Sequence, residues 1–324
     1  MDLKFKQPSK ESKITMSKVA IGEDNEDYSK IAEDKLCNFT NHNECKLVNS
    51  GNAAILTAMN SIEGAILIPN QGGWNGFKQI ANFLNKEIIT VKTNQGLIEK
   101  SHLEEAILNN KELLSNSQNG LFLTSFAAYT AEQNIKEISN FAHENDILII
   151  EDASGAISDS TKKLANGNYS DIIIGSTGSP KIVNVGYGGF ITTNNEEIFN
   201  KSKIILKTSK INNIIASGIS TELDFAKENL NKHLKAANYL KNNLNNVIHQ
   251  NKRGINVIIS SDDKSLFFNL KNELKLDTHG MITKCPNYNR LKIKGVAIEL
   301  KNLDISCLSK EILDDIINIV NKYQ

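Results

Sequence analysis

The stretch IIEDASGAISDSTKKLANGNYSDIIIGSTGSPKIVNVGYGG, residues 149–189, carries most of the information about the fold and the site. Its first apolar run ends in Glu151-Asp152, and its second ends in Gly-Ser-Thr-Gly-Ser-Pro-Lys at residues 175–181. Both runs are typical of buried strands of a parallel sheet. In open α/β sheets, functional groups gather at the carboxyl ends of the strands. The two strand ends therefore predict a site that contains Asp152 and Lys181.

An acid and a lysine in these two places match what pyridoxal-phosphate (PLP) chemistry needs. The cofactor requires a lysine amine for a Schiff base and an acid that keeps its pyridine nitrogen protonated. Lys181 fits the first role and Asp152 the second. Taken singly, Asp152 could cap a loop and Lys181 could be a solvated surface charge. Their combination is what indicates a PLP site.

Outward from this stretch, short apolar runs alternate with amphipathic helical patterns. In the pattern at 134–144, for example, Ile135, Ile138 and Phe141 fall on one helix face. Strands alternating with helices favour a mostly parallel sheet with helices on both faces. The predicted strands are 65–69, 87–91, 121–125, 147–151, 171–175 and 189–193.

The same pattern divides the chain into three parts. Residues 1–25 are polar and weakly periodic and predict an N-terminal arm. Residues 26–240 predict a large domain whose seven-stranded sheet lies between helices, and residues 241–324 a small C-terminal α/β domain. A long helix is predicted at 221–248, across the boundary between the two domains.

The quoted stretch resembles the DegT/StrS family of PLP-dependent aminotransferases, which have the aspartate aminotransferase fold, PLP fold type I. The family pattern is roughly EDAA(Q/H) followed by SFHPxKxxTxGEGG. Ser176 falls on the family serine, Lys181 on the Schiff-base lysine, and Gly186, Gly188 and Gly189 on the GxGG. The resemblance implies that the Ser176 hydroxyl binds the cofactor phosphate. Without the motif, the serine hydroxyl could simply form a hydrogen bond with the local backbone. The glycines could simply form a hairpin or bulge.

A second stretch, CKLVNSGNAAILTAM at 45–59, resembles the family's AVxVSSGTxALxLAL. There a strand turns into a helix whose first backbone N–H groups hold the phosphate, an arrangement that suits a dianion. The resemblance implies that Gly51, Asn52 and Ala53 form this cradle. Asn52 replaces the usual threonine, a change that leaves the backbone donors in place.

Two further residues are candidates for the site. Trp74, the only tryptophan, lies in AILIPNQGGWNGF, which resembles the family's VIVPSFTFVAT. The resemblance implies that an aromatic residue here stacks on the pyridine ring, whereas a core position is the ordinary alternative. Arg290 is one of only two arginines, and a guanidinium is the usual bidentate partner of a substrate carboxylate. A surface or domain-interface position is the alternative for Arg290.

The chain also departs from the family pattern. The Gln or His three residues beyond the ring-binding acid is Gly155, and the Glu of GEGG is Tyr187. The family's segment that reaches the neighbouring subunit's phosphate aligns with Ser217 at its Asn and Ile219 at its Arg. These changes leave PLP binding as the expectation and put the family's usual nucleotide-sugar substrate in doubt.

The function that these observations favour is transfer of an amino group from an amino acid to a keto or aldehyde acceptor. The sugar-linked acceptors of the family are one case of such an acceptor. One alternative is a PLP-dependent lyase or β-replacement enzyme, similar to selenocysteine synthases or to desulfurases. Cys285 is the candidate nucleophile for desulfurase chemistry, against a merely buried cysteine. The other alternative is a non-catalytic protein with the PLP fold.

Composition limits the partners. The 324 residues carry 37 basic and 37 acidic side chains, a balance that argues against nucleic-acid or membrane-surface binding. Four cysteines without CxxC spacing suit a reducing cytoplasm and indicate neither a disulfide framework nor a metal site. No apolar run approaches the roughly 18 residues of a membrane helix. The resemblance further implies a homodimer, with small-molecule donors and acceptors as the other partners.

Overall fold

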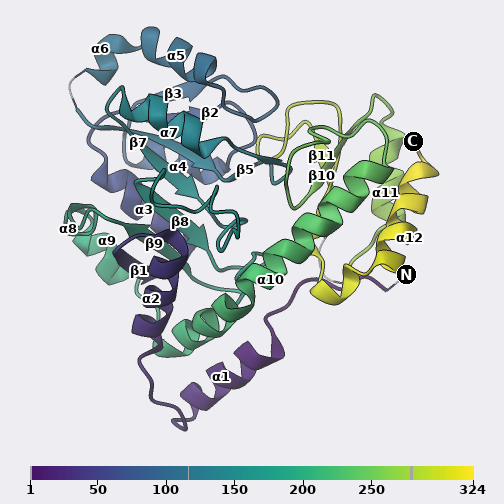
Figure 1. The fold of residues 1–324 in the computed structure, drawn as a ribbon, viewed down its shortest axis with the longest axis horizontal. Coiled ribbons are helices and arrows are strands. Elements are labelled where there is room, and N and C mark those ends of the chain that lie inside the picture. The colour runs from purple at the N-terminus through teal and green to yellow at the C-terminus, as the bar shows by residue number, and fades with distance from the viewer. Residues whose placement is uncertain (1, 116, 278–279) are drawn as a thin grey trace.

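A seven-stranded sheet forms the centre of the larger part of the molecule in the computed structural model, which describes residues 2–115, 117–277 and 280–324 (Figure 1). The strand order is β1-β9-β8-β7-β4-β2-β3. Strand β9 is antiparallel to both of its neighbours, and every other neighbouring pair is parallel. The mostly parallel seven-stranded sheet predicted from the sequence is therefore present. The strands are β1 (Glu44–Val48), β2 (Ile66–Pro69), β3 (Ile88–Val91), β4 (Asn119–Thr124), β7 (Ile147–Asp152), β8 (Ile172–Ser176) and β9 (Gly189–Thr193).

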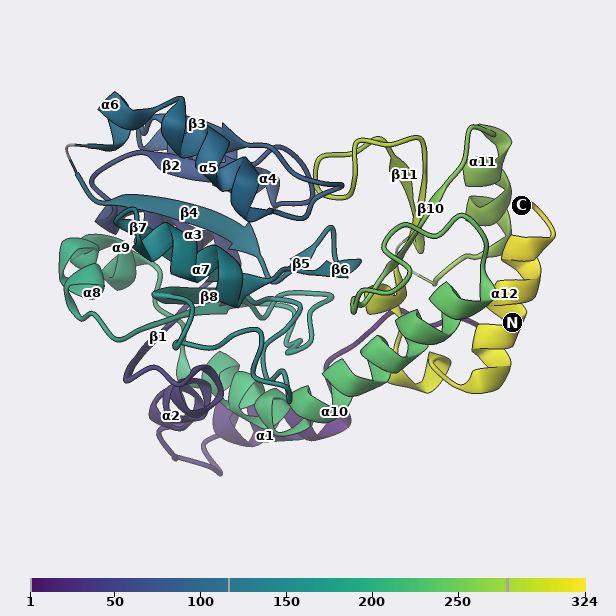
Figure 2. The same cartoon turned by 45° about the horizontal axis from the view of Figure 1, so that its top comes forward.

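Helices cover both faces of this sheet (Figure 2). The isoleucine-rich strands are buried on both sides, which explains why they read as continuous apolar runs. One face packs against α2 (Tyr28–Thr40), α5 (Lys100–Leu108), α7 (Ile135–His143) and the first half of α10. The other packs against α3 (Gly51–Ser61), α4 (Asn75–Phe83) and α8 (Glu197–Lys201), while α6 (Lys111–Leu114) and α9 (Lys203–Thr208) are short peripheral helices.

The smaller part has its own apolar core around a three-stranded antiparallel sheet. Strand β12 (Gly295–Ile298) lies between β10 (Val257–Ser260) and β11 (Ile282–Cys285). Helices α11 (Ser265–Glu273) and α12 (Lys310–Asn321) pack against it, together with the second half of α10. Two 3-10 turns, η1 (Leu300–Asn302) and η2 (Ile305–Cys307), connect β12 to α12.

Helix α10 (Asn213–Asn243) joins the two parts and differs from the predicted helix at 221–248. It begins at an Asn212 cap, whose Oδ1 accepts a hydrogen bond from the Ile215 N–H at 2.9 Å. The small residues of its first turns look like a loop in the sequence, yet Ser217 and Gly218 are buried there. Figure 1 shows α10 running from beside the large sheet into the small part, so it crosses the predicted boundary at residue 240.

Residues 2–25 pack against both parts of the molecule. Helix α1 (Lys10–Ala20) follows an extended segment in which Leu3 and Phe5 are 4% exposed. The Lys6 N–H donates to the Asn302 carbonyl at 2.8 Å, so this segment is hydrogen-bonded to the small part. Figure 1 places both chain ends beside the small part. In the ranges that the structure describes, no helix is both long and apolar enough to cross a membrane.

Candidate active site

A cavity of about 230 Å³ lies at the carboxyl ends of β7 and β8, where the start of α3 faces them. It brings together side chains from segments that are far apart in the sequence. Six of the residues singled out in the sequence line it: Gly51, Asn52, Trp74, Asp152, Ser176 and Lys181. Ala53 and Arg290 do not line it.

Asp152 ends β7 and is held by the serine two residues further along the chain. Its Oδ1 accepts hydrogen bonds from the Ser154 N–H at 3.0 Å and from the Ser154 hydroxyl at 2.5 Å. The Ser154 Oγ in turn accepts the N–H of Ser176, at the end of β8, at 2.8 Å. Ser154 thus couples the two strand ends and orients the carboxylate, a role that the sequence analysis did not assign.

Lys181 lies five residues beyond Ser176, and its amine points to an aromatic residue that the sequence analysis missed. The Lys181 Nζ donates to the Tyr129 hydroxyl at 2.9 Å. Burial disfavours the ammonium, but Tyr129 and the negative charge of Asp152 outweigh it and raise the pKa of Lys181 above its ordinary value. The structure therefore places this amine as a hydrogen-bond donor to Tyr129.

The start of α3 provides the anion-binding end of the cavity. The first amides of a helix have no carbonyl partner within it, and the helix dipole favours an anion there. The Ser50 Oγ caps the Ala53 N–H at 3.1 Å, so Gly51 and Asn52 are the members of the predicted cradle that line the cavity. A Cβ on Gly51 would lie 2.7 Å from the Ser176 Cβ, and only glycine lets the helix approach so closely.

Trp74 caps α4 at the edge of the cavity rather than in a core. The residue is 38% exposed, and its indole Nε1 donates to the Asn52 Oδ1 at 3.0 Å. With amides and a serine hydroxyl at one end, an acid and a lysine at the other and an indole at the edge, these residues fit PLP. The donors suit the phosphate, the carboxylate suits the pyridine nitrogen, and the amine suits the aldehyde.

Arg290 does not have the free guanidinium that a carboxylate clamp requires. Its Nε and Nη2 donate to the two oxygens of Glu299 at 2.6 and 2.8 Å, and its Nη1 donates to the Asn289 carbonyl at 2.7 Å. The guanidinium also lies 5.1 Å from the centre of the Tyr129 ring. Arg290 therefore forms an ion pair with Glu299 next to the Tyr129 ring, and this geometry does not favour the predicted contact with substrate.

Glu299 makes this ion pair sensitive to acid. Burial would raise its pKa, but Arg290 and Lys301 outweigh burial and lower the pKa to about 2. Glu299 therefore stabilises the folded state above its ordinary pKa of 4.5, and the contribution is lost as the pH falls from there toward 2. We expect Glu299→Gln to lower the free energy of unfolding at neutral pH by about 3 kcal/mol. In urea unfolding at several pH values, the difference from the parent protein should shrink below pH 4.5; a constant difference would contradict it.

Two other residues that the sequence singled out, Ser217 and Cys285, do not line the cavity. The segment around Ser217 was expected to reach a partner subunit, but Ser217 is buried in α10 and donates to the Ile214 carbonyl, and Ile219 is buried as well. Cys285, the candidate nucleophile of a desulfurase, is 3% exposed at the end of β11. Burial raises the pKa of its thiol, which disfavours a reactive thiolate.

Comparison with solved structures identifies the fold. Helicobacter pylori PseC, an aminotransferase of pseudoaminic acid biosynthesis, superposes with a TM-score of 0.79 over 99% of both chains at 14% identity. A structure of SPT with PLP superposes with a TM-score of 0.76 over 99% of this chain and 86% of that one at 11% identity. The architecture is PLP fold type I, which confirms the predicted fold class.

Sequence comparison then identifies the family. A family model described as the DegT/DnrJ/EryC1/StrS aminotransferase family matches residues 18–213, so the chain belongs to that family. Membership agrees with PLP as the predicted cofactor, and the family is described as one of aminotransferases, the enzyme class that the resemblance implied. A second model, the MJ1341 family C-terminal domain, matches residues 227–321.

Curated relatives match over a shorter region. A UDP-4-amino-4,6-dideoxy-N-acetyl-beta-L-altrosamine transaminase of Campylobacter jejuni subsp. jejuni serotype O:23/36 (strain 81-176) is 27% identical over 177 residues. The match covers 53% of this chain and 45% of the relative, so the chain spans about half the length of the curated relatives it matches.

Proposed function

We propose that this protein is an aminotransferase that moves an amino group from an amino acid to a keto or aldehyde acceptor in the cavity at the ends of β7 and β8. The observation that carries the proposal is the convergence there of Asp152, Lys181 and the start of α3. In the family these are the groups that bind the ring nitrogen, the aldehyde and the phosphate of PLP. Bound there, PLP would supply the electron sink that makes the α-proton of an amino acid acidic.

Each residue has a defined task in this proposal. Lys181 would attach the cofactor and, when an amino acid displaces it, carry the proton between the substrate Cα and the cofactor C4′. Asp152 would keep the ring nitrogen protonated. Within the described residues, the hydrogen bonds recorded for its carboxylate fall on Oδ1, and Oδ2 is left for that nitrogen. Gly51, Asn52 and Ser176 would bind the phosphate, and Trp74 would cover the ring.

The acceptor that the comparisons support is a sugar linked to a nucleotide. The Campylobacter jejuni relatives are named as transaminases of such a sugar, and PseC is described as an aminotransferase involved in the biosynthesis of pseudoaminic acid. Gly155 and Tyr187 replace residues of the family pattern, so the acceptor can differ from the family's usual one. A keto acid is the alternative to test.

The experiment is a pair of half-reactions followed by absorbance. The purified protein with PLP is mixed with single amino acids, and loss of the visible band of the bound cofactor identifies a donor. Adding a UDP-linked keto sugar or a keto acid should then restore the band for one class of acceptor. A band that no amino acid changes would favour the non-catalytic alternative, and release of a keto acid with ammonia would favour a lyase.

The proposal includes a homodimer in the cytoplasm. In relatives of this fold the cofactor lies against a second subunit, and two-fold dimers are the commonest closed assembly. All four cysteines of the chain are free thiols, which suits a reducing compartment. Light scattering should give twice the 35.9 kDa of one chain. A monomer that retains PLP fully would contradict a site shared between subunits.

A further inference from the structure

The amine of Lys181 has one side-chain partner recorded within the described residues, the hydroxyl of Tyr129. Tyr129 reaches it from the turn between two short strands, β5 (Phe126–Ala127) and β6 (Ala131–Glu132), just beyond the end of β4. The tyrosine also lines the cavity. A hydroxyl at 2.9 Å from the reactive amine is in position to direct that amine.

The space that the Tyr129 ring occupies is open because residue 155 is glycine. A Cβ on Gly155 would lie 3.2 Å from two carbon atoms of the Tyr129 ring. A side chain there would require the Tyr129 ring, or the Ile255 side chain at the same distance, to shift by a few tenths of an ångström. Gly155, where the family has Gln or His, therefore leaves the space in which the Tyr129 ring lies when its hydroxyl contacts Lys181.

The turn that carries Tyr129 has an unfavourable backbone conformation. Ala128 and Tyr129 have φ angles of 53° and 62°, in the left-handed region that favours glycine and asparagine. Residues in this conformation are strained, and they persist only where the surrounding structure imposes them.

Segments outside the turn hold its backbone directly. The Tyr129 carbonyl accepts the N–H groups of Ile255 and Asn256 at 2.8 and 3.0 Å. Gly254 lies so close that a Cβ there would come within 2.2 Å of the Thr130 carbonyl oxygen. The segment that leads into β10 of the small part is thus packed onto the turn.

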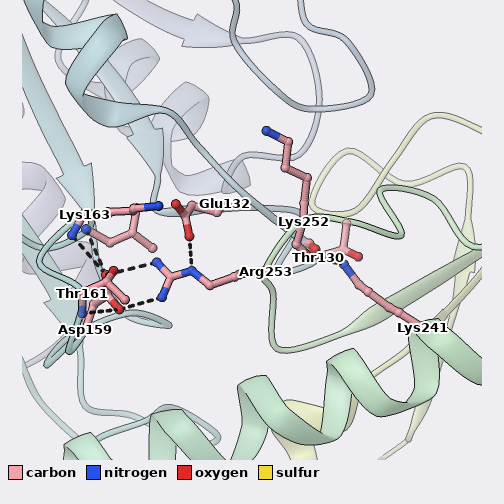
Figure 3. Close-up of polar contacts among 9 residues, drawn as sticks. Thr130, Glu132, Asp159, Thr161, Lys163, Lys241, Lys252 and Arg253 are labelled. Atoms are coloured by element: carbon pink, nitrogen blue, oxygen red, sulfur yellow. Dashed lines mark hydrogen bonds and ion pairs between the residues drawn. The ribbon is translucent and has the colours of Figure 1, made fainter.

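Two cations complete this support (Figure 3). Lys241 reaches from α10 and donates to the carbonyl of Thr130 at 2.6 Å and to that of Lys252 at 2.8 Å. Arg253 donates to both oxygens of Asp159, at 2.9 and 3.2 Å, and forms an ion pair with Glu132. The small part and the long helix therefore fix the turn, and with it the position of Tyr129.

The charges that face Lys181 leave Tyr129 as its principal polar contact. Asp152 at the end of β7 attracts the ammonium, and Arg290 repels it. The Lys301 amine of η1 lies 5.2 Å from the centre of the Tyr129 ring, and burial lowers the pKa of Lys301 to about 7. Glu299 is already occupied by Arg290.

We propose that Tyr129 is a positioning residue for the reactive lysine: its hydroxyl holds the free Lys181 amine in the cavity, and the small part sets the turn that places it. The inference rests on the proposed function, in which Lys181 is free whenever the amino acid has displaced it. It adds a contact that couples the reactive amine to the small part.

The test measures Lys181 itself, in the full-length protein without cofactor. Competitive labelling with a trace of acetic anhydride at several pH values, followed by peptide mass spectrometry, yields the labelling midpoint of single lysines. Tyr129→Phe removes only the hydroxyl. Loss of a hydrogen bond to a charged group should move the Lys181 midpoint roughly one to two pH units lower. Exposed Lys227, measured in the same digest, should keep its midpoint.

Gly155→Ala provides a second variant, because its Cβ presses on the Tyr129 ring without changing the hydroxyl. It should move the Lys181 midpoint in the same direction by a smaller amount. An unchanged Lys181 midpoint in Tyr129→Phe would overturn the proposal, as would an unchanged midpoint in Gly155→Ala if Tyr129→Phe does not fold. Because labelling requires no turnover, this result is independent of whether the protein transfers amino groups.

Discussion

Lys181→Ala should lower turnover on the order of 10⁴-fold, the upper end of what a proton-transferring side chain supplies. The same change should abolish covalent attachment of PLP, because the variant lacks the amine that Tyr129 presents in the cavity. Noncovalent binding should survive in part, since the start of α3 and Ser176 remain. The measurements are the steady-state rate with a donor and acceptor pair, the cofactor retained after gel filtration of the native protein, and the cofactor that stays on the chain in a denaturant after borohydride reduction.

The matched control is Lys227→Ala, which removes an exposed lysine of α10 outside the cavity. It should keep both the rate and the bound cofactor. A Lys181→Ala protein that turns over within tenfold of the parent would mean that another group carries the proton.

Asp152→Ala should lower turnover at least about a hundredfold while the fold stays intact. Ser154 holds the carboxylate through Oδ1 at the end of β7, and under the proposed function its loss would remove the charge that keeps the ring nitrogen protonated. Asp152→Asn keeps the shape and should lower the rate comparably, because an amide cannot hold that proton. Circular dichroism and the rate constant are measured together.

Glu144→Ala is the control for Asp152, because it removes an exposed acid just before β7, at the opposite end of the same strand. It should leave the rate unchanged. Full activity in Asp152→Ala would show that the strand-end acid only caps a loop.

The parts of the site that follow from strand order could be predicted from the sequence. Asp152 and Ser176 end neighbouring parallel strands, and Lys181 follows Ser176 at a short fixed spacing, so local pattern alone brings them to one edge. The seven-stranded sheet followed for the same reason, because each buried strand is a continuous apolar run.

The parts that depend on tertiary packing could not be predicted. Tyr129 was missed because its turn holds Ala128 and Tyr129 in left-handed conformations without the Asn or Gly that signals such a turn. Arg290 was assigned to substrate because its partner, Glu299, lies on the far side of β12 in the sequence. The long helix was predicted to begin at residue 221, whereas α10 begins at Asn213. The small buried residues of its first turns resemble a loop in the sequence.

The central claim is that Lys181 is the residue that carries PLP. The most direct test is reduction of the PLP-loaded protein with borohydride, followed by proteolysis and mass spectrometry of the labelled peptide. The account predicts one pyridoxyl group per chain on Lys181, and none in Lys181→Ala. A pyridoxyl group on another lysine, or no labelled peptide in a protein that binds PLP, would contradict it.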